Sequence, residues 1–343
     1  MGKATVNDKQ NLLLSIQQAY GLEIIHLEFL LRGFGGDCYR VETNAGSQYF
    51  LKIHDPVSNQ TLAASSRAFY LPLMHQLHTK AILPQIPHPL PTRNGDLSLK
   101  VGANELVITN FIEGELVGFD EMPGAIVAQV AEMVGILHNS LAQLEFEHAF
   151  IDQFEIVFEQ DLLQSFAALP NLNASATPGQ GLLRDLVLPR QDEIIASLHR
   201  LKELQAYAQG STKPKVICHT DLHGGNLMID KQGNLFILDW ENALIAPPEH
   251  DLIFFAGEEN FREVFWPQYT HQFKQAKIDC DILGFYFYRR GLEDIADFIL
   301  RILRGNNSPE RDQQEIEWMV GCINGLAQIE CTLSRLAAGF AAL

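Results

Sequence analysis

The N-terminal third of the chain alternates short runs of β-forming residues with strong turn signals. Residues 25–34 form an apolar run that ends in a glycine turn at 35–37, and residues 38–43 follow as a second run. After the Asn-Ala-Gly-Ser turn at 44–47, residues 48–54 alternate apolar and polar side chains. Runs of this length separated by tight turns are typical of strands that pair with their sequence neighbours. We therefore predict an antiparallel meander of three strands.

Two further elements are expected before residue 115. The apolar spacing of residues 61–80 predicts a helix, and Pro72 implies a kink or a later start, because proline cannot donate the helical hydrogen bond. Residues 97–101 and 105–112 flank a Gly-Ala-Asn turn and predict a second hairpin.

Beyond residue 115 the apolar periodicity becomes helical. Side chains recur every three or four residues, first at Ile126, Val130, Val134 and Leu137. Similar patterns run from residue 281 to the end, and one more strand pair is predicted at residues 227–230 and 235–239. The predicted fold class is α+β, with a small antiparallel β-rich part followed by a larger helical part.

The charge of the chain limits its partners. It carries 25 Lys and Arg against 42 Asp and Glu, a formal net charge of −17. Because nucleic-acid binding needs a cationic surface, we expect no nucleic-acid partner. No stretch reaches the ~20 apolar residues that span a bilayer, and no secretory segment is recognisable, so no membrane association is expected. Five scattered cysteines without a C-x-x-C pair predict a cytoplasmic location.

The most informative segment is His-Thr-Asp-Leu-His-Gly-Gly-Asn at residues 219–226, followed by a strand pair that ends in Asp239. Phosphoryl transfer needs a carboxylate near the attacking hydroxyl and oxygen ligands that hold a hard cation against the phosphates. Asp221 can supply the first, and Asn226 and Asp239 can supply the second. Lys52 in the third predicted strand adds a positive charge for the phosphates. This pattern predicts a phosphotransfer site.

Two other interpretations of these residues stay open. Asp, Asn and Gly are common at strand junctions, so the same residues can be turn and capping groups. His219, Asp221 and His223 can also be read as the zinc site of a hydrolase, although such sites need further ligands at recognisable spacing. For His219, a buried hydrogen-bonding role that holds the loop is favoured over metal binding.

HTDLHGGN followed by ILDWEN resembles the aminoglycoside phosphotransferase family, relatives of choline kinase that carry forms such as HGDLHPGN and IDW. Residues 246–252 match the element that follows the metal site in that family. In the C-terminal helices, residues 288–290 and 292–296 look most like spectinomycin phosphotransferases. The resemblance implies a bilobal protein-kinase-like fold, with a nucleotide-binding lobe over residues 1–112. Residues 113–343 would then form a helical lobe with the catalytic loop and the acceptor site.

The resemblance also implies roles for individual residues. Asp221 would be the catalytic base or the carboxylate that orients the hydroxyl, and Asn226 and Asp239 would hold Mg²⁺. Lys52 would contact the phosphates of ATP, with GTP as an alternative nucleotide. The remaining nucleotide contacts are expected at the first glycine turn and at the end of the second hairpin, at Gly35, Gly36, Asn110, Phe111 and Ile112.

The acceptor is expected to be a small hydroxylated molecule. The resemblance points to an aminocyclitol or aminoglycoside such as spectinomycin, and hence to antibiotic resistance. Alternative acceptors are choline, thiamine, homoserine and sugars. A different class of function, a catalytically weak kinase-like protein that binds nucleotides, also fits the motifs. The protein is expected to be a monomer or a homodimer.

The acceptor site is assigned to the catalytic loop and one C-terminal helix. The predicted acceptor contacts are Asp221, Trp240, Glu241, Glu293 and Asp294. Glu293 and Asp294 would form an acidic wall for the protonated amines of an aminocyclitol. The alternative is a solvated helix face on which Arg290 and Arg301 neutralise the carboxylates.

Two departures from the family pattern stand out. No Asp or Glu occurs in residues 56–95, so the helical acid that normally positions the strand lysine is missing. Either the nucleotide alone holds Lys52, or a hydrogen-bonding side chain takes that place, at Gln60, Ser65 or Ser66. In the catalytic loop, Thr220 and Gly224 replace the commoner Gly and Pro, and we expect this change to have no consequence for the chemistry.

Overall fold

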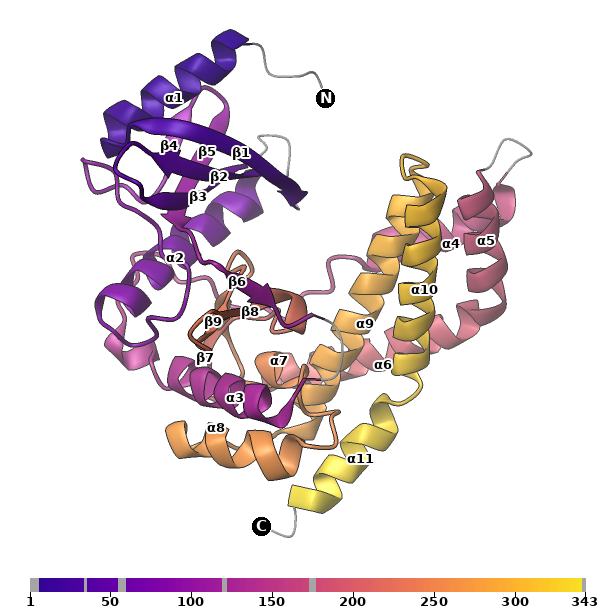
Figure 1. The fold of residues 1–343 in the computed structure, drawn as a ribbon. Helices are drawn as coiled ribbons and strands as arrows, with labels where there is room; N and C mark the ends of the chain where they lie inside the picture. Colours follow the sequence, from indigo (N-terminus) through magenta and orange to yellow (C-terminus); the bar gives the residue numbers. More distant parts are fainter. Residues whose placement is uncertain (1–5, 34–35, 55–59, 119–121, 173–176, 341–343) are drawn as a thin grey trace. The chain divides into compact units, whose positions relative to one another are not determined.

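The computed structural model describes residues 6–33, 36–54, 60–118, 122–172 and 177–340. The chain forms two compact units that interleave along the sequence (Figure 1). The first unit comprises Met1–Ile151, Val216–Ala246 and Asn260–Gln275, and the second comprises Asp152–Lys215, Pro247–Glu259 and Ala276–Leu343. These units are not the nucleotide and acceptor lobes predicted with a boundary after residue 112, and that functional division stays a prediction.

The first unit contains a five-stranded antiparallel sheet, in which the strands follow the order β1-β2-β3-β5-β4 (Figure 1). Its strands are β1 (Ile24–Gly33), β2 (Gly36–Thr43), β3 (Gln48–His54), β4 (Leu99–Val101) and β5 (Asn104–Asn110). The predicted meander and the predicted second hairpin are therefore confirmed. The tight turns explain the order, since each joins strands that are adjacent in the sheet.

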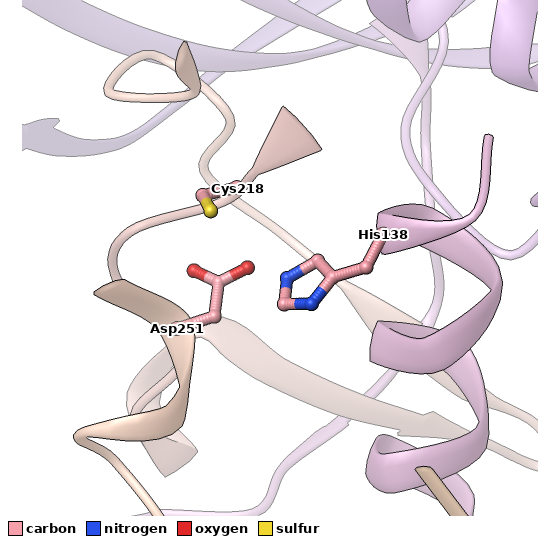
Figure 2. Close-up of side chains that lie close together, drawn as sticks. All are labelled: His138, Cys218 and Asp251. Atoms are coloured by element: carbon pink, nitrogen blue, oxygen red, sulfur yellow. The ribbon is translucent and has the colours of Figure 1, made fainter. Parts of the chain in front are cut away.

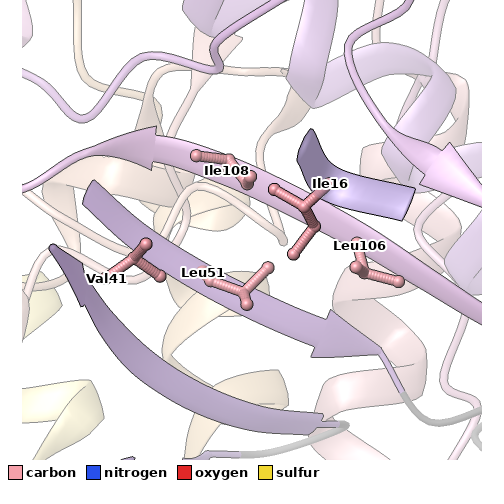
Figure 3. Close-up of a cluster of buried hydrophobic side chains, with 5 residues drawn as sticks. All are labelled: Ile16, Val41, Leu51, Leu106 and Ile108. Atoms are coloured by element: carbon pink, nitrogen blue, oxygen red, sulfur yellow. The ribbon is translucent and has the colours of Figure 1, made fainter. Parts of the chain in front are cut away.

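One face of this sheet is covered by α1 (Val6–Tyr20). Ile16 of the helix packs against Val41, Leu51, Leu106 and Ile108, and all five side chains are fully buried (Figure 3). Successive side chains of a strand point to opposite faces, so this core uses alternate positions of each strand. Each such burial stabilises the fold by about 1.5–3 kcal/mol. Helix α1 was not predicted from the sequence.

Helix α2 (Gln60–Thr79) runs continuously through Pro72, so the expected later start is wrong. A proline inside a helix removes one backbone hydrogen bond and costs roughly 3 kcal/mol. Phe69, Leu73 and Leu77 lie at helical spacing on one face and are fully buried, which offsets that cost.

The rest of the first unit carries shorter strands and two helices that pack together. β6 (Gly114–Leu116) pairs with β8 (Leu227–Asp230), and β8 pairs with β9 (Leu235–Ile237). β7 (Val216–Cys218) pairs with β10 (Leu244–Ala246). The helices are α3 (Gly124–His138) and α8 (Trp266–Gln272), with a π-helical turn at Phe261–Phe265 before α8. The strand pair predicted around residue 230 is confirmed, whereas β6, β7 and β10 were not predicted.

The described part of the second unit is helical. Its helices are α4 (Glu159–Ala168), α5 (Pro178–Val187), α6 (Gln191–Gly210), α7 (Glu249–Leu252), α9 (Cys280–Leu303), α10 (Pro309–Leu326) and α11 (Ile329–Phe340). Helix α9 lies against α6, α10 and α11, and Gly284 lets Leu204 and Leu333 approach its backbone closely. Among the described residues, no helix has the length and apolar character needed to cross a membrane.

Candidate active site

The loop at residues 219–226 leaves β7 and is held by the fully buried His219. The Nε2–H of His219 donates to the carbonyl of Leu238 (2.7 Å), and its Nδ1 accepts from the backbone N–H of Asp221 (3.3 Å). Both ring nitrogens are thus committed to the backbone, and neither has a lone pair left for zinc. This arrangement agrees with the buried hydrogen-bonding role predicted for His219 and argues against a zinc site of a hydrolase.

Asp221 and Asn226 converge within the loop, which turns through a short 3₁₀ helix at Gly224–Asn226. The amide nitrogen of Asn226 donates to the carbonyl of Asp221 (2.9 Å) and to its carboxylate Oδ2 (3.0 Å). Because the nitrogen is used in this way, the amide oxygen is the atom that Asn226 can offer to a cation. The Nε2 of His223 lies 3.4 Å from the same carboxylate oxygen of Asp221.

Thr220 and Asp239 both adopt left-handed backbone conformations, with φ of +74° and +56°. Such a conformation is costly for a β-branched residue, and strain of this kind gathers at functional sites. The Thr220 hydroxyl donates to the carbonyl of Asn242 (3.1 Å), which ties the loop to the turn after Asp239. Glycine adopts this conformation without strain and threonine does not, so the change from Gly affects the backbone. That it has no consequence for the chemistry stays a prediction.

The pairing of β8 with β9 brings Asp239 back to Asn226. Leu227 lies opposite Ile237, and the N–H of Leu238 donates to the carbonyl of Asn226 (2.8 Å). β9 ends at Ile237, earlier than predicted, and Asp239 is exposed just beyond it. Amide and carboxylate oxygens are hard donors, so this pair fits a magnesium ion by its chemistry.

Lys52 lies in the middle of the sheet and forms an ion pair with Glu241. Its strand position is opposite Cys38 on β2 and Val107 on β5. Burial acts to lower the pKa of Lys52, but the carboxylates of Glu241 and Asp239 outweigh it and raise that pKa above its usual value. The acidic partner that α2 lacks is therefore present, on a distant segment of the sequence.

Ser66 does not replace the missing acid by bonding to the lysine, as one alternative expected. Its hydroxyl, on α2, donates to the backbone carbonyl of Glu241. From the sequence, we expected the acidic partner of Lys52 on α2 and predicted Glu241 as a contact of the acceptor. Its pairing with Lys52 favours the nucleotide side instead.

The remaining residues predicted at the nucleotide lie along the sheet. Gly36 sits so close to β3 that a Cβ there would collide with the carbonyl oxygen of Ile53, whereas Gly35 lies outside the described residues. Asn110 is fastened to the proline-rich segment: its side-chain oxygen accepts from the N–H of His88 (2.7 Å), and its own N–H donates to the His88 carbonyl (3.3 Å). The partly buried Phe111 and Ile112 follow directly.

The predicted acceptor residues differ in their surroundings. Trp240 is only 1% exposed and donates its indole N–H to the Ile237 carbonyl (2.8 Å), which favours packing over contact with an acceptor. On α9 of the second unit, Asp294 pairs with Arg290 (3.0 Å). Glu293 has no ion-pair partner among the residues that the structure describes, and burial raises its pKa.

Two buried side chains of the first unit, His138 on α3 and Cys218 on β7, face each other (Figure 2). Nδ1 of His138 forms a hydrogen bond with the Tyr269 hydroxyl (2.8 Å), and the Cys218 thiol donates to the Ala246 carbonyl (3.7 Å). These partners favour a structural role for His138.

Comparison with known proteins defines the class to which this fold and site belong. The chain is similar to a spectinomycin phosphotransferase solved with ADP and spectinomycin (TM-score 0.73, 17% identity, 94% of this chain and 98% of that one). It is also similar to a microcompartment-associated aminopropanol kinase (TM-score 0.62, 13% identity, 95% and 98%). A choline kinase from Streptococcus pneumoniae matches as well (TM-score 0.53, 14% identity, 94% and 99%). The fold is thus the kinase-like fold of the aminoglycoside phosphotransferases.

The family follows from the sequence match. The phosphotransferase enzyme family matches residues 26–286, and the chain belongs to that family. The matched range contains Lys52, the loop with Asp221 and Asn226, and Asp239, and it ends inside α9.

Proposed function

We propose that this protein is an ATP-dependent phosphotransferase that moves the γ-phosphoryl group to a hydroxyl of a small molecule. The observation that carries the proposal is the group formed by Asp221, Asn226, Asp239 and Lys52 within one unit. Family membership and the likeness to an enzyme solved with ADP support it.

Each residue of the group has a distinct task in this proposal. Asp221 accepts the proton of the attacking hydroxyl or orients that hydroxyl, and the amide of Asn226 holds its carboxylate in place. The oxygens of Asn226 and Asp239 would hold Mg²⁺, which neutralises charge on the phosphates when it is bound. Lys52 binds the phosphates as a positive charge.

For the acceptor we propose a cationic hydroxylated molecule such as an aminocyclitol. Glu293 supports this choice, because it carries a carboxyl group that no neighbouring cation pairs among the described residues. The likeness to a spectinomycin phosphotransferase supports it as well. Asp294 is already neutralised by Arg290 and contributes less. Choline and amino alcohols are alternative cationic acceptors, given the likeness to choline and aminopropanol kinases.

The direct test is transfer of labelled phosphate from ATP to a panel of aminocyclitols, aminoglycosides, amino alcohols and sugars. We expect transfer to at least one cationic acceptor, and a loss of about 10²- to 10⁴-fold in Asp221→Asn with nucleotide affinity kept. Transfer to no acceptor, with Mg²⁺-dependent nucleotide binding retained, would favour the alternative of a kinase-like binding protein.

A further inference from the structure

Glu241 is held in place by contacts to two other elements. It lies in the turn between Asp239 and β10, where the N–H of Ala243 donates to the carbonyl of Trp240 (3.0 Å). The Ser66 hydroxyl of α2 donates to the carbonyl of Glu241, and the Thr220 hydroxyl donates to the next carbonyl, that of Asn242. The backbone of Glu241 is thus fixed from α2 and from the catalytic loop.

The carboxylate of Glu241 reaches Lys52, the cationic side chain that the proposed mechanism uses at the phosphates. It pairs with Lys52, whose side chain is 13% exposed, while the Glu241 side chain is 30% exposed. The lysine is therefore largely shielded from solvent, whereas the carboxylate of Glu241 remains partly accessible. A charge-assisted contact of this kind restricts a flexible lysine to one geometry.

We propose that Glu241 is the positioning residue for Lys52, in place of the helical acid that residues 56–95 lack. This inference rests on the proposed function, and it goes beyond it by giving Glu241 a nucleotide-side task. The turn that carries Asp239 then places both a metal ligand and the phosphate-binding lysine. Helix α2 contributes the Ser66 hydroxyl, which fixes the turn.

Two other roles for Glu241 lead to different results. As an acceptor contact, its loss would raise the KM for the acceptor and leave ATP unaffected. As a blocking group that ATP must displace from Lys52, its loss would tighten ATP binding. As a positioning residue, its loss weakens ATP binding, because the lysine must then be ordered by the nucleotide alone.

The test compares Glu241→Gln with a matched control, Glu105→Gln. Glu105 on β5 pairs with Arg67 of α2 (2.8 Å), and both side chains are shielded to a similar degree. We expect Glu241→Gln to lower kcat/KM for ATP about ten- to hundredfold, with an unchanged acceptor KM, and Glu105→Gln to change either by less than about twofold. Glu241→Asp, which keeps the charge, should recover part of the loss.

The separate values of KM and kcat supply a second measurement that a purely structural role would not affect. Because Lys52 must then be ordered by the nucleotide alone, Glu241→Gln should raise the KM for ATP more than it lowers kcat. Glu105→Gln should leave both values close to those of the wild type.

The outcomes separate this inference from the proposed function. If wild type transfers phosphate and Glu241→Gln matches it in KM and kcat for ATP, or binds ATP more tightly, the inference is wrong and the function stands. If wild type transfers no phosphate but Glu241→Gln weakens its binding of ATP as measured by calorimetry, the function fails and the positioning role survives.

Discussion

Two lysine–glutamate pairs, one in each unit, look alike in chemistry and differ in their surroundings. In the second unit, Glu249 is fully buried and pairs with Lys213, which is 15% exposed. Lys213 also donates to the carbonyl of Lys277 (2.7 Å), and Glu249 accepts from the N–H of Asp279 (2.7 Å). Backbone groups thus bond to both members of this pair and join α7 to the start of α9. The second carboxylate oxygen of Glu249, Oε2, is buried without a hydrogen-bond partner among the described residues.

The pair in the first unit is arranged differently. Lys52 faces a second carboxylate, Asp239, and its partner Glu241 stays 30% exposed. Two acids near one lysine leave an excess of negative charge that a metal ion can balance. From this difference we infer that the fully buried pair, which also bonds to backbone groups, contributes to stability, whereas the partly exposed pair is available to the nucleotide proposed above.

The largest effect on stability is expected from Glu249→Ala. This change leaves Lys213 and a backbone N–H of Asp279 without their buried acceptor, and breaking a buried pair costs about 3–5 kcal/mol. The unfolding midpoint measured by calorimetry should fall by about 6–12 °C. The folded fraction should keep its ATP KM, and a raised ATP KM would contradict the division between the two pairs.

Glu293→Gln and Asp294→Asn extend the comparison to two carboxylates on one helix, of which Asp294 has an ion-pair partner and Glu293 has none among the described residues. Removing the unpaired charge of Glu293 should raise the acceptor KM about tenfold at low salt, and less as salt is added. Asp294→Asn should have a smaller effect, because Arg290 already neutralises it. Steady-state kinetics with a confirmed acceptor measure these KM values at several salt concentrations. Equal, salt-independent acceptor KM values for both variants would refute the acidic wall.

A smaller effect on stability is expected at Thr220, whose left-handed backbone lies in the catalytic loop beside the Lys52–Glu241 pair. Thr220→Gly should melt within about 1 kcal/mol of the wild type, because relief of the left-handed backbone offsets the lost hydroxyl contact to Asn242. Thr220→Val keeps the strain and loses that contact, so it should be less stable by about 1–2 kcal/mol. If the valine variant is the more stable of the two in thermal melts, the strain account is wrong.

The smallest effect is expected for an ion pair that is far more exposed than the two pairs compared above. Lys231 and Glu113 form an ion pair (2.8 Å) in which both side chains are 70% exposed. Water screens such pairs, so Lys231→Ala should leave the melting temperature and the kinetics unchanged. A clear loss of stability in this variant would mean that exposure does not separate the pairs as we argue.

What the sequence could predict was local. The meander follows from turns and alternation within single strands, and the catalytic loop from residues within one short motif. β6, β7 and β10 are only three residues long, too short for a periodic signal. The partner of Lys52 could not be found in this way, because Glu241 reaches it only after β3, α2 and the turn beyond β9 have packed together.

We propose above that Lys52, Asn226 and Asp239 belong to one magnesium–nucleotide site. Calorimetric titration of ATP into wild type and Asp239→Ala, each with Mg²⁺ and with EDTA, tests it without knowledge of the acceptor. We predict that Mg²⁺ tightens ATP binding in the wild type and has no such effect in Asp239→Ala, because the variant lacks the carboxylate that holds the ion. Equal tightening by Mg²⁺ in both proteins would contradict the claim.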